Sequence, residues 1–177
     1  MKFTELEIVG AYLIELEEFK DERGTFARQF CKEELKKYNI DFDIKQCNLS
    51  KNTRKGTLRG MHYQAMPYPE IKLVSCMKGR IYDTILDLRK DSKTYLKWIG
   101  IELSPENRRM LYIPPEVAHG FQTLEDETYV YYQLGEFFKP EYYKGVRYND
   151  SAFGIDFPIK ENIIISEKDK NYQDWEV

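Results

Sequence analysis

The chain contains few of the residues that cross-link small folds. Its 177 residues include only three cysteines, Cys31, Cys47 and Cys76, and none of them belongs to a C-x-x-C pair. An odd number of widely spaced cysteines argues against a disulfide framework and against a zinc site. A chain of this length needs neither, because it can bury roughly 70% of its unfolded surface. We expect three buried thiols that act as small apolar groups.

Long apolar runs are also missing. No stretch approaches the roughly 20 apolar residues of a membrane-spanning helix. The N-terminal segment MKFTELEIVGAY carries acids where a signal peptide would have a basic start and an apolar block. We therefore expect a cytoplasmic protein with no membrane partner. The formal net charge of −3 argues against nucleic acid as a partner, although a local basic pocket for a small anion is compatible with it.

Histidine is scarce, and this limits metal chemistry. The two histidines are His62 and His119, and the sequence has no H-x-H or H-x-x-E-H run. Metal-dependent barrel oxygenases need two or three histidines and a carboxylate at one centre, so we expect no metal and treat such an oxygenase as a disfavoured alternative. The motifs G-x-x-x-x-G-K, G-x-G-x-x-G and G-x-S-x-G are absent, which excludes the common phosphate-binding loops and the serine nucleophile elbow.

What the chain does contain is a series of strand-like segments. Residues 71–77 and 80–88 are rich in β-branched side chains, and the Lys-Gly step between them predicts a hairpin. Residues 108–113 stop at a double proline, and residues 128–134 form an aromatic and β-branched run. These segments favour an antiparallel all-β fold in a single domain over residues 1–177, with a jelly roll as the preferred architecture.

Helices play a small part in the predicted fold. One short helix is expected over residues 31–38, where Cys31, Leu35 and Tyr38 recur at helical spacing. The polar stretch 166–177 is expected to be helical or irregular.

Strand alternation suggests which side chains line a cavity. In the segment IKQCNLS, Gln46 and Asn48 share one face with Ile44, whereas Cys47 and Leu49 lie on the other. Two amides on one face are typical of a polar cavity wall. An exposed edge strand explains the same pattern equally well.

Three basic residues occur close together around the first histidine. Arg59 and His62 belong to the segment LRGMHYQ, and Lys72 stands between Ile71 and Leu73. A lysine among apolar residues is costly to bury unless it meets an anion. Each residue alone is more often structural, but the cluster points to a binding or catalytic site.

The second histidine and a distant acid complete the set. His119 follows a double proline and precedes Gly120, so a rigid turn fixes its position. Asp169 lies in SEKD. An acid that accepts a hydrogen bond from histidine Nδ1–H would orient the ring and raise its basicity, although a solvated surface acid is the default for Asp169.

Six segments together resemble a known family. They are DERGTFARQF, NLSKNTRKGTLRGMHYQ, KLVSCMKGRIYDTILDLRKDS, IPPEVAHGFQTL, YNDSAFGIDFP and SEKD. They are similar to segments of the dTDP-4-dehydrorhamnose 3,5-epimerases, and the R-G-x-H-Y-Q and A-H-G-F motifs in this order are the most specific part. The resemblance implies a cupin-type jelly-roll barrel with short peripheral helices, a homodimer, and no cofactor or metal.

The resemblance also implies a reaction and roles for residues. The substrate is a nucleotide-diphosphate-linked 4-keto-6-deoxyhexose, inverted at C3 and C5 through an enolate, which needs a base, a donor on the opposite face and positive charge near O4. His62 would be the base, Asp169 its partner and Tyr132 the proton donor. Lys72 and His119 would stabilise the enolate and hold the sugar. The implied nucleotide-sugar ligands are Arg23, Gln46, Asn48, Arg59 and Lys168.

The sequence departs from the family pattern at several positions. Arg28 and Tyr143 stand where members carry glutamates, and Phe137 and Phe138 replace a tyrosine pair. These changes leave open an epimerase that inverts one centre only or uses another nucleotide sugar, such as a CDP- or GDP-linked one. A non-catalytic barrel that only binds a sugar nucleotide is a further alternative, although a binder needs no base.

Overall fold

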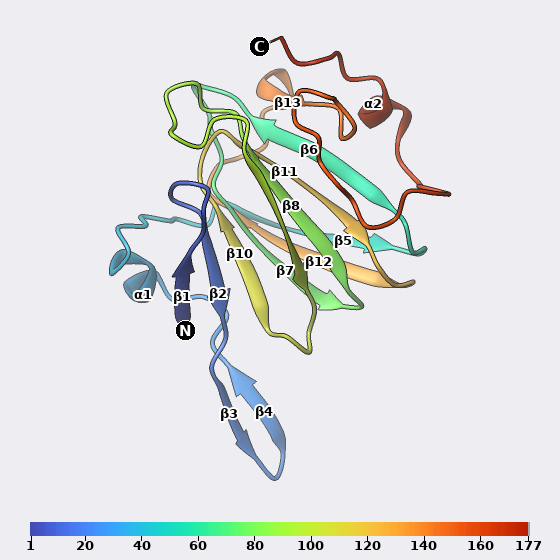
Figure 1. The fold of residues 1–177 in the computed structure, drawn as a ribbon. Coiled ribbons are helices and arrows are strands. Elements are labelled where there is room, and N and C mark those ends of the chain that lie inside the picture. The colour runs from blue at the N-terminus through green and yellow to red at the C-terminus, as the bar shows by residue number, and fades with distance from the viewer. Residues whose placement is uncertain (177) are drawn as a thin grey trace.

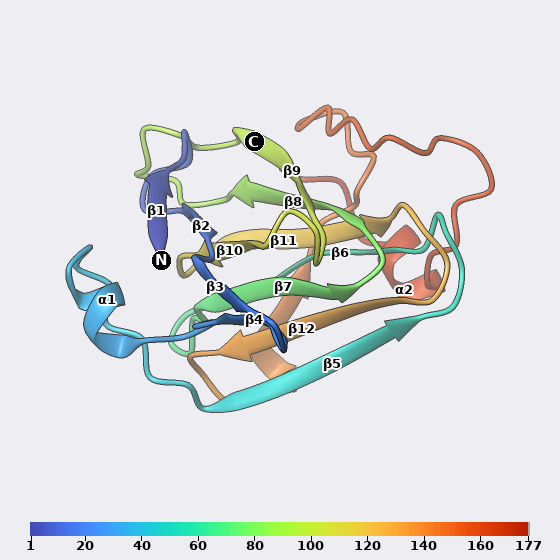
Figure 2. The same cartoon turned by 90° about the horizontal axis from the view of Figure 1, so that it is seen from below.

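Two antiparallel sheets form the body of the protein, and the computed structural model describes residues 1–176 of the chain (Figure 1). In spatial order, the six-stranded sheet contains β1 (Lys2–Glu5), β2 (Tyr12–Glu15), β10 (Arg109–Ile113), β7 (Lys72–Lys78), β12 (Thr128–Leu134) and β5 (Gln46–Asn52). The five-stranded sheet contains β13 (Tyr143–Gly145), β6 (Leu58–Gln64), β11 (Val117–Thr123), β8 (Ile81–Asp87) and β9 (Trp98–Leu103). Seen from below, the sheets lie one over the other (Figure 2). This arrangement is the predicted jelly roll.

The core lies between the two sheets because apolar side chains alternate toward it along each strand. Val74 and Val130 come from the six-stranded sheet, and Ile85 and Phe121 come from the five-stranded one; all four are at most 1% exposed. The predicted strands at 108–113 and 128–134 correspond to β10 and β12, so the double-proline stop and the β-branched and aromatic composition located them correctly.

The predicted hairpin at the Lys-Gly step is wrong. The strands β7 and β8 that flank Gly79 belong to different sheets. Each of them already has a hydrogen-bonded neighbour on both sides, and both are largely buried, so neither has a free edge for the other. Gly79 takes the chain across the core with φ +74°, and a Cβ there would lie 2.4 Å from the Thr128 hydroxyl.

The helices are short and peripheral. Helix α1 (Lys32–Lys36) is the predicted helix, shorter at both ends, and Asn39 shortly after it has φ 58°, which ends the helical path. Its Leu35 packs over one end of the outer face of the six-stranded sheet, beside Phe42 and Leu73. Helix α2 (Glu167–Lys170) follows near the C-terminus, and a single 3-10 turn, η1, covers Pro140–Tyr142.

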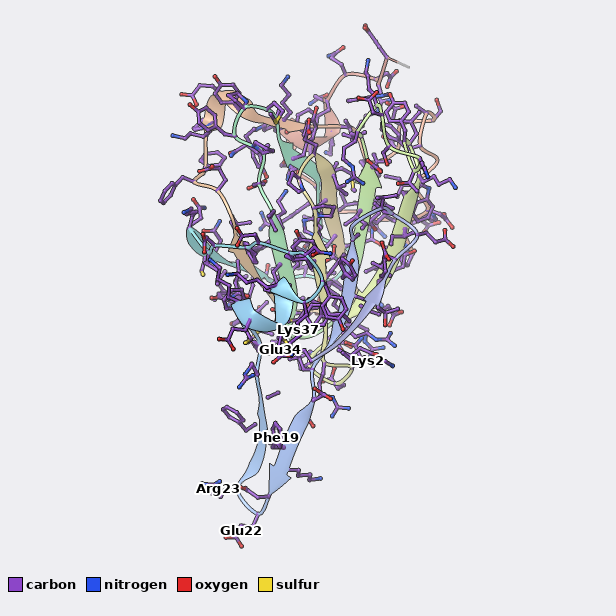
Figure 3. All side chains as sticks on the ribbon, turned by 90° about the vertical axis from the view of Figure 1, so that its left-hand side faces the viewer. Lys2, Phe19, Glu22, Arg23, Glu34 and Lys37 are labelled. Carbon is purple, nitrogen blue, oxygen red and sulfur yellow. The ribbon has the colours of Figure 1, made fainter. Side chains whose placement is uncertain are left out.

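A two-stranded hairpin projects from the body. It consists of β3 (Glu18–Asp21) and β4 (Gly24–Ala27), and it extends well beyond the two sheets (Figures 1 and 3). Phe19 and Phe26 face each other across it and are 71% and 72% exposed. Isolated hairpins are marginally stable in water, and the two rings of this one are left uncovered by the rest of residues 1–176.

The cysteines are free thiols, as predicted, but they are not all buried. Cys76 is buried between the sheets, Cys31 is half-buried, and Cys47 is exposed. The expectation of three buried thiols fails at Cys47 because β5 is an edge strand, and Cys47 lies on its outward face.

Candidate active site

A cavity of about 900 Å³ opens between the two sheets. Eight of the ten residues singled out from the sequence line it: Gln46, Asn48, Arg59, His62, Lys72, His119, Tyr132 and Asp169. They come from five strands and from α2, so the jelly roll brings together residues that are far apart in the chain.

The two histidines face the cavity as direct neighbours. His62 on β6 and His119 on β11 are cross-strand partners, so their side chains lie on the same face of the five-stranded sheet. The strands approach closely at Gly60 and Gly120, which lie in the irregular stretch between the His119–His62 and Phe121–Arg59 pairs. A Cβ on Gly60 would lie 2.4 Å from the Gly120 Cα. The glycines beside both histidines therefore set the strand spacing at the site.

Tyr132 reaches the cavity from the opposite sheet. It lies on β12, and its ring packs edge-to-face with the His119 ring at a centroid distance of 6.0 Å. Burial, with the nearby Asp83 carboxylate, raises the pKa of the Tyr132 hydroxyl well above its usual value. This hydroxyl is therefore held in its protonated form.

His62 forms the predicted pair with Asp169. The distance between His62 Nε2 and Asp169 Oδ1 is 2.7 Å. The expectation named Nδ1, but Nε2 makes the contact, and this leaves Nδ1 free to take a proton. Asp169 is 5% exposed rather than a solvated surface acid.

The position of Asp169 is fixed by local hydrogen bonds. Ser166 caps α2 by accepting a hydrogen bond from the Asp169 backbone N–H at 3.1 Å, and Gly60 N–H donates to Asp169 Oδ2 at 3.4 Å. Burial raises the pKa of the Asp169 carboxyl, but the hydrogen bond from His62 and the contacts with Gly60 and Ser166 outweigh it. The net pKa lies below its usual value. The carboxylate is thus ionised beside His62.

A second histidine–aspartate contact was not anticipated. His119 Nε2 lies 2.6 Å from Asp83 Oδ1, although the angles do not meet hydrogen-bond geometry. Asp83 is completely buried on β8. The signal was present in RIYDTILDL, where an acid interrupts the apolar face of a strand, because a buried carboxylate requires a partner.

Lys72 has the anionic partner that its surroundings required. Its ammonium lies 2.8 Å from Glu70 Oε1 and donates a hydrogen bond to the His62 carbonyl oxygen at 3.0 Å. The Glu70 contact is an ion pair by distance, without good hydrogen-bond angles. Glu70 also lines the cavity. The sequence reasoning missed it, although it stands two residues before the lysine.

Both explanations of the two amides on β5, a polar cavity wall and an edge strand, are correct. Gln46, Asn48 and Ser50 line the cavity, and β5 is also the edge of its sheet. Gln46 Oε1 accepts a hydrogen bond from the Phe138 backbone N–H at 2.9 Å, and Arg59 Nε donates to Asn52 Oδ1 at 2.8 Å.

Two predicted ligands lie outside the cavity lining. Lys168 is exposed on α2, with its ammonium 5.4 Å from the centre of the Tyr143 ring at the cavity wall. Arg23 lies at the end of the β3–β4 hairpin, paired with Asp21 and 84% exposed (Figure 3). Within one copy of the chain, Arg23 does not contribute to the cavity.

Of the four residues that differ from the family pattern, two line the cavity and two lie outside its lining. Tyr143 and Phe138 line the cavity, and the Tyr143 ring lies 5.2 Å from the His62 ring. Burial, followed by the nearby Glu70 carboxylate, raises the pKa of Tyr143. Phe137 is exposed, and Arg28 forms an ion pair with Glu34.

Residues 1–176 contain neither a cluster of metal ligands nor a membrane-spanning helix. Over residues 1–176, no three of the histidine, cysteine and acidic side chains are grouped as a metal site would need. Within that range, no helix has the length and apolar character needed to cross a bilayer.

The fold and the cavity together define a class of protein. A jelly roll that places an ionised aspartate against a histidine, opposite a buried tyrosine, is suited to enzymes that move protons on a bound ligand. The chain belongs to the dTDP-4-dehydrorhamnose 3,5-epimerase family, whose sequence model matches residues 5–176. Epimerases are isomerases, and inverting a carbon centre requires proton transfer. The acid–base groups of the cavity are therefore consistent with this family.

Individual relatives cover almost the whole chain. The dTDP-4-dehydrorhamnose 3,5-epimerase of Methanothermobacter thermautotrophicus is 41% identical over 97% of this chain and 93% of the relative. The crystal structure of the Elizabethkingia anophelis enzyme superposes with a TM-score of 0.95 at 37% identity, over 99% of this chain and 96% of that one. The Legionella pneumophila enzyme, solved in complex with dTDP-4-keto-L-rhamnose, has a TM-score of 0.89 at 34% identity, over 95% and 89%.

Proposed function

We propose that the protein inverts C3 and C5 of dTDP-4-dehydro-6-deoxyglucose, giving dTDP-4-dehydro-L-rhamnose for deoxysugar and cell-surface polysaccharide synthesis in the cytoplasm, without metal or cofactor. The observation that carries the proposal is that the His62–Asp169 pair and Tyr132 line one cavity from opposite sheets. Inversion requires proton removal on one face and proton delivery on the other, and this arrangement provides a group for each.

His62 acts as the base in this proposal. With Nε2–H donated to Asp169, the Nδ1 lone pair takes a proton from the carbon next to the C4 carbonyl. The C–H electron pair forms the carbon–carbon double bond of an enolate, and negative charge moves to O4. The Asp169 carboxylate, 2.7 Å away, stabilises the imidazolium that results.

Lys72 and His119 then face the developing charge. Lys72 is buried with its ammonium beside the cavity, and His119 lies next to His62 on the same sheet. A positive or hydrogen-bonding group near O4 lowers the energy of the enolate more than that of the ketone, which is the condition for catalysis.

Tyr132 delivers the new proton. Its O–H bond breaks, the proton adds to the enolate carbon on the face opposite His62, and the C4 ketone re-forms. The raised pKa keeps the hydroxyl protonated until an enolate is present. His62 and Tyr132 exchange protons with solvent before the next centre reacts.

We propose that the sugar nucleotide is bound by Arg59, Gln46, Asn48 and Lys168. The arginine suits the diphosphate because a guanidinium binds two oxyanion atoms at once. Lys168, with its ammonium over the ring of cavity-lining Tyr143, adds positive charge beside the cavity.

We propose a homodimer, and the position of Arg23 supports it. Its hairpin extends away from the cavity of its own chain and exposes Phe19 and Phe26. Packing the hairpin against a second copy would bury both rings and bring Arg23 to the cavity of that copy. Size-exclusion chromatography with light scattering tests this, because Phe19→Asp should shift the protein from dimer to monomer.

The main alternative is an epimerase that inverts only one centre or prefers another nucleotide sugar. Tyr143 and Phe138 support it, since both replace family residues at the cavity wall. A CDP- or GDP-linked 4-keto sugar is the competing substrate.

One experiment separates these possibilities. The purified protein is incubated in deuterated water with dTDP-, CDP- and GDP-linked 4-keto-6-deoxyglucose, and proton NMR follows C3 and C5. The proposal expects deuterium and inversion at both carbons of the dTDP sugar. Binding without exchange at either carbon would instead identify a non-catalytic barrel.

A further inference from the structure

We propose that Glu70 is a positioning residue for Lys72, an inference that rests on the proposed function. In this view Glu70 touches no reacting atom and acts by holding the Lys72 ammonium where the enolate oxygen forms.

Glu70 and Lys72 form a buried pair of opposite charges. The Glu70 and Lys72 side chains are 4% and 7% exposed, and the carboxylate oxygen lies 2.8 Å from the ammonium. An unpaired ammonium or carboxylate at such a depth is strongly unfavourable, and removing one partner leaves the other uncompensated. A charged lysine can therefore lie in the cavity wall because Glu70 pairs with it.

The lysine is also tied to the strand that carries the base. Its ammonium donates to the His62 carbonyl oxygen at 3.0 Å. A lysine ammonium has three N–H donors, so the contacts with Glu70 and His62 leave donor capacity for a third oxygen. An O4 enolate in the cavity is the oxygen that the proposed reaction supplies.

Glu70 itself lies in a segment with little freedom. Gln64, fully buried at the end of β6, donates to the carbonyl oxygens of Tyr68 at 2.6 Å and Phe137 at 3.2 Å. The Gly135 N–H donates to the Ile71 carbonyl oxygen at 2.9 Å on the other side of Glu70. The backbone that carries the Glu70 side chain is thus held on both sides before substrate binds, and such preorganisation is the source of electrostatic catalysis.

A carboxylate beside a lysine also weakens the positive charge that substrate meets. Two effects therefore oppose each other: Glu70 fixes the ammonium and partly neutralises it. We expect position to dominate, because a displacement of about 1 Å from productive geometry can cost on the order of 100-fold in rate. If neutralisation dominated, removing the Glu70 charge would raise kcat.

The test is a double-mutant cycle on the epimerisation of dTDP-4-dehydro-6-deoxyglucose. Glu70→Gln, which keeps shape and removes charge, should lower kcat about 10- to 100-fold and change KM less than about threefold. Glu70→Asp, which keeps the charge on a shorter side chain, should recover part of the loss. In a Lys72→Met background, Glu70→Gln should change kcat by less than about twofold, since its effect passes through the lysine.

The controls separate positioning from folding and from the proposed function. Glu7→Gln, at an exposed site outside the cavity lining, should behave as wild type, and calorimetric binding of dTDP should be unchanged in Glu70→Gln. A kcat of Glu70→Gln at or above the wild-type value overturns the inference, and so does an equal loss in the Lys72→Met background. If Glu70→Gln does not fold, Glu70→Asp decides, and wild-type kcat in that variant rejects the inference. A wild type without epimerase activity rejects the proposed function instead.

Discussion

The two histidine–aspartate contacts are neighbours in space and differ in construction. His62 meets an aspartate that arrives on α2 from the end of the chain, and its side chain is 19% exposed to the cavity. His119 meets Asp83 from the adjacent strand β8, with side chains 5% and 0% exposed. The first contact joins an accessible ring to a hydrogen-bonded carboxylate, whereas the second is enclosed in the barrel. The difference suggests that one histidine moves protons while the other holds a fixed position.

The largest effect is expected from exchanging the histidines for alanine in turn. His62→Ala should abolish turnover and also the entry of solvent deuterium into substrate, because it removes the proposed base. His119→Ala should lower kcat about 100-fold while deuterium exchange persists, since it removes one stabilising group only. NMR in deuterated water measures both. Near wild-type exchange in His62→Ala would reject His62 as the base.

Tyr132→Phe tests the proposed proton donor, which lies in the cavity wall opposite both histidines. The variant should still exchange deuterium into recovered substrate with retention, because His62 can remove and return protons on its own face. Inversion, at C5 especially, should collapse because the opposite face has lost its donor. NMR of substrate and product after incubation distinguishes the two. Full inversion at both carbons would move the donor role to another group, such as Tyr143.

Substituting the two aspartates should affect different properties: activity for Asp169 and stability for Asp83. Asp169→Asn should lower kcat about 10³- to 10⁴-fold with the fold intact, because an amide cannot stabilise the imidazolium. Asp83→Asn should act more on stability than on rate, since a buried polar atom is altered inside the barrel. Steady-state kinetics and urea unfolding of both variants give the comparison, and the reverse pattern would contradict the distinction.

Acid should weaken the His62–Asp169 contact in a defined direction. The pKa of Asp169 is lowered in the folded protein, so its contribution to stability is present above its unfolded value of about 4. That contribution is lost as pH falls below this value, through the folded pKa. Urea unfolding at pH 6 and pH 3 should therefore show a steeper acid loss in wild type than in Asp169→Asn. Equal slopes would show that Asp169 carries no folded-state shift.

Chelation should have the smallest effect. Prolonged treatment with EDTA should leave both epimerisation and the melting temperature unchanged, because within residues 1–176 neither histidine lies in a group of potential metal ligands. Activity that disappears and returns with a divalent metal would show that one histidine–aspartate contact binds a cation.

Local pattern predicted the strands but not their partners. Composition identified the strands that became β10 and β12, and alternation correctly placed the amides of Gln46 and Asn48 toward the cavity. The Lys-Gly step suggested a hairpin, yet Gly79 crosses between sheets, because pairing depends on edges that only the full fold defines.

The missed residues have a similar cause. Asp83 interrupts an apolar strand and is explained by His119, which meets it only in the folded chain. Glu70 stands two residues before its partner Lys72, and the fold determines only that this pair is buried. Asp169 was assigned through family resemblance, since its neighbours are charged and nothing local marks it as buried. Sequence pattern gives the face of a strand, whereas the partner of a buried charge is a long-range property.

The origin of Asp169 in α2 affects when activity appears during synthesis. Every strand precedes α2 in the chain, so the barrel and His62 emerge from the ribosome before the aspartate does. A nascent chain that has already paired its sheets would bind ligand without an activated base. Catalysis would then begin only when the last segment leaves the exit tunnel and docks against β6.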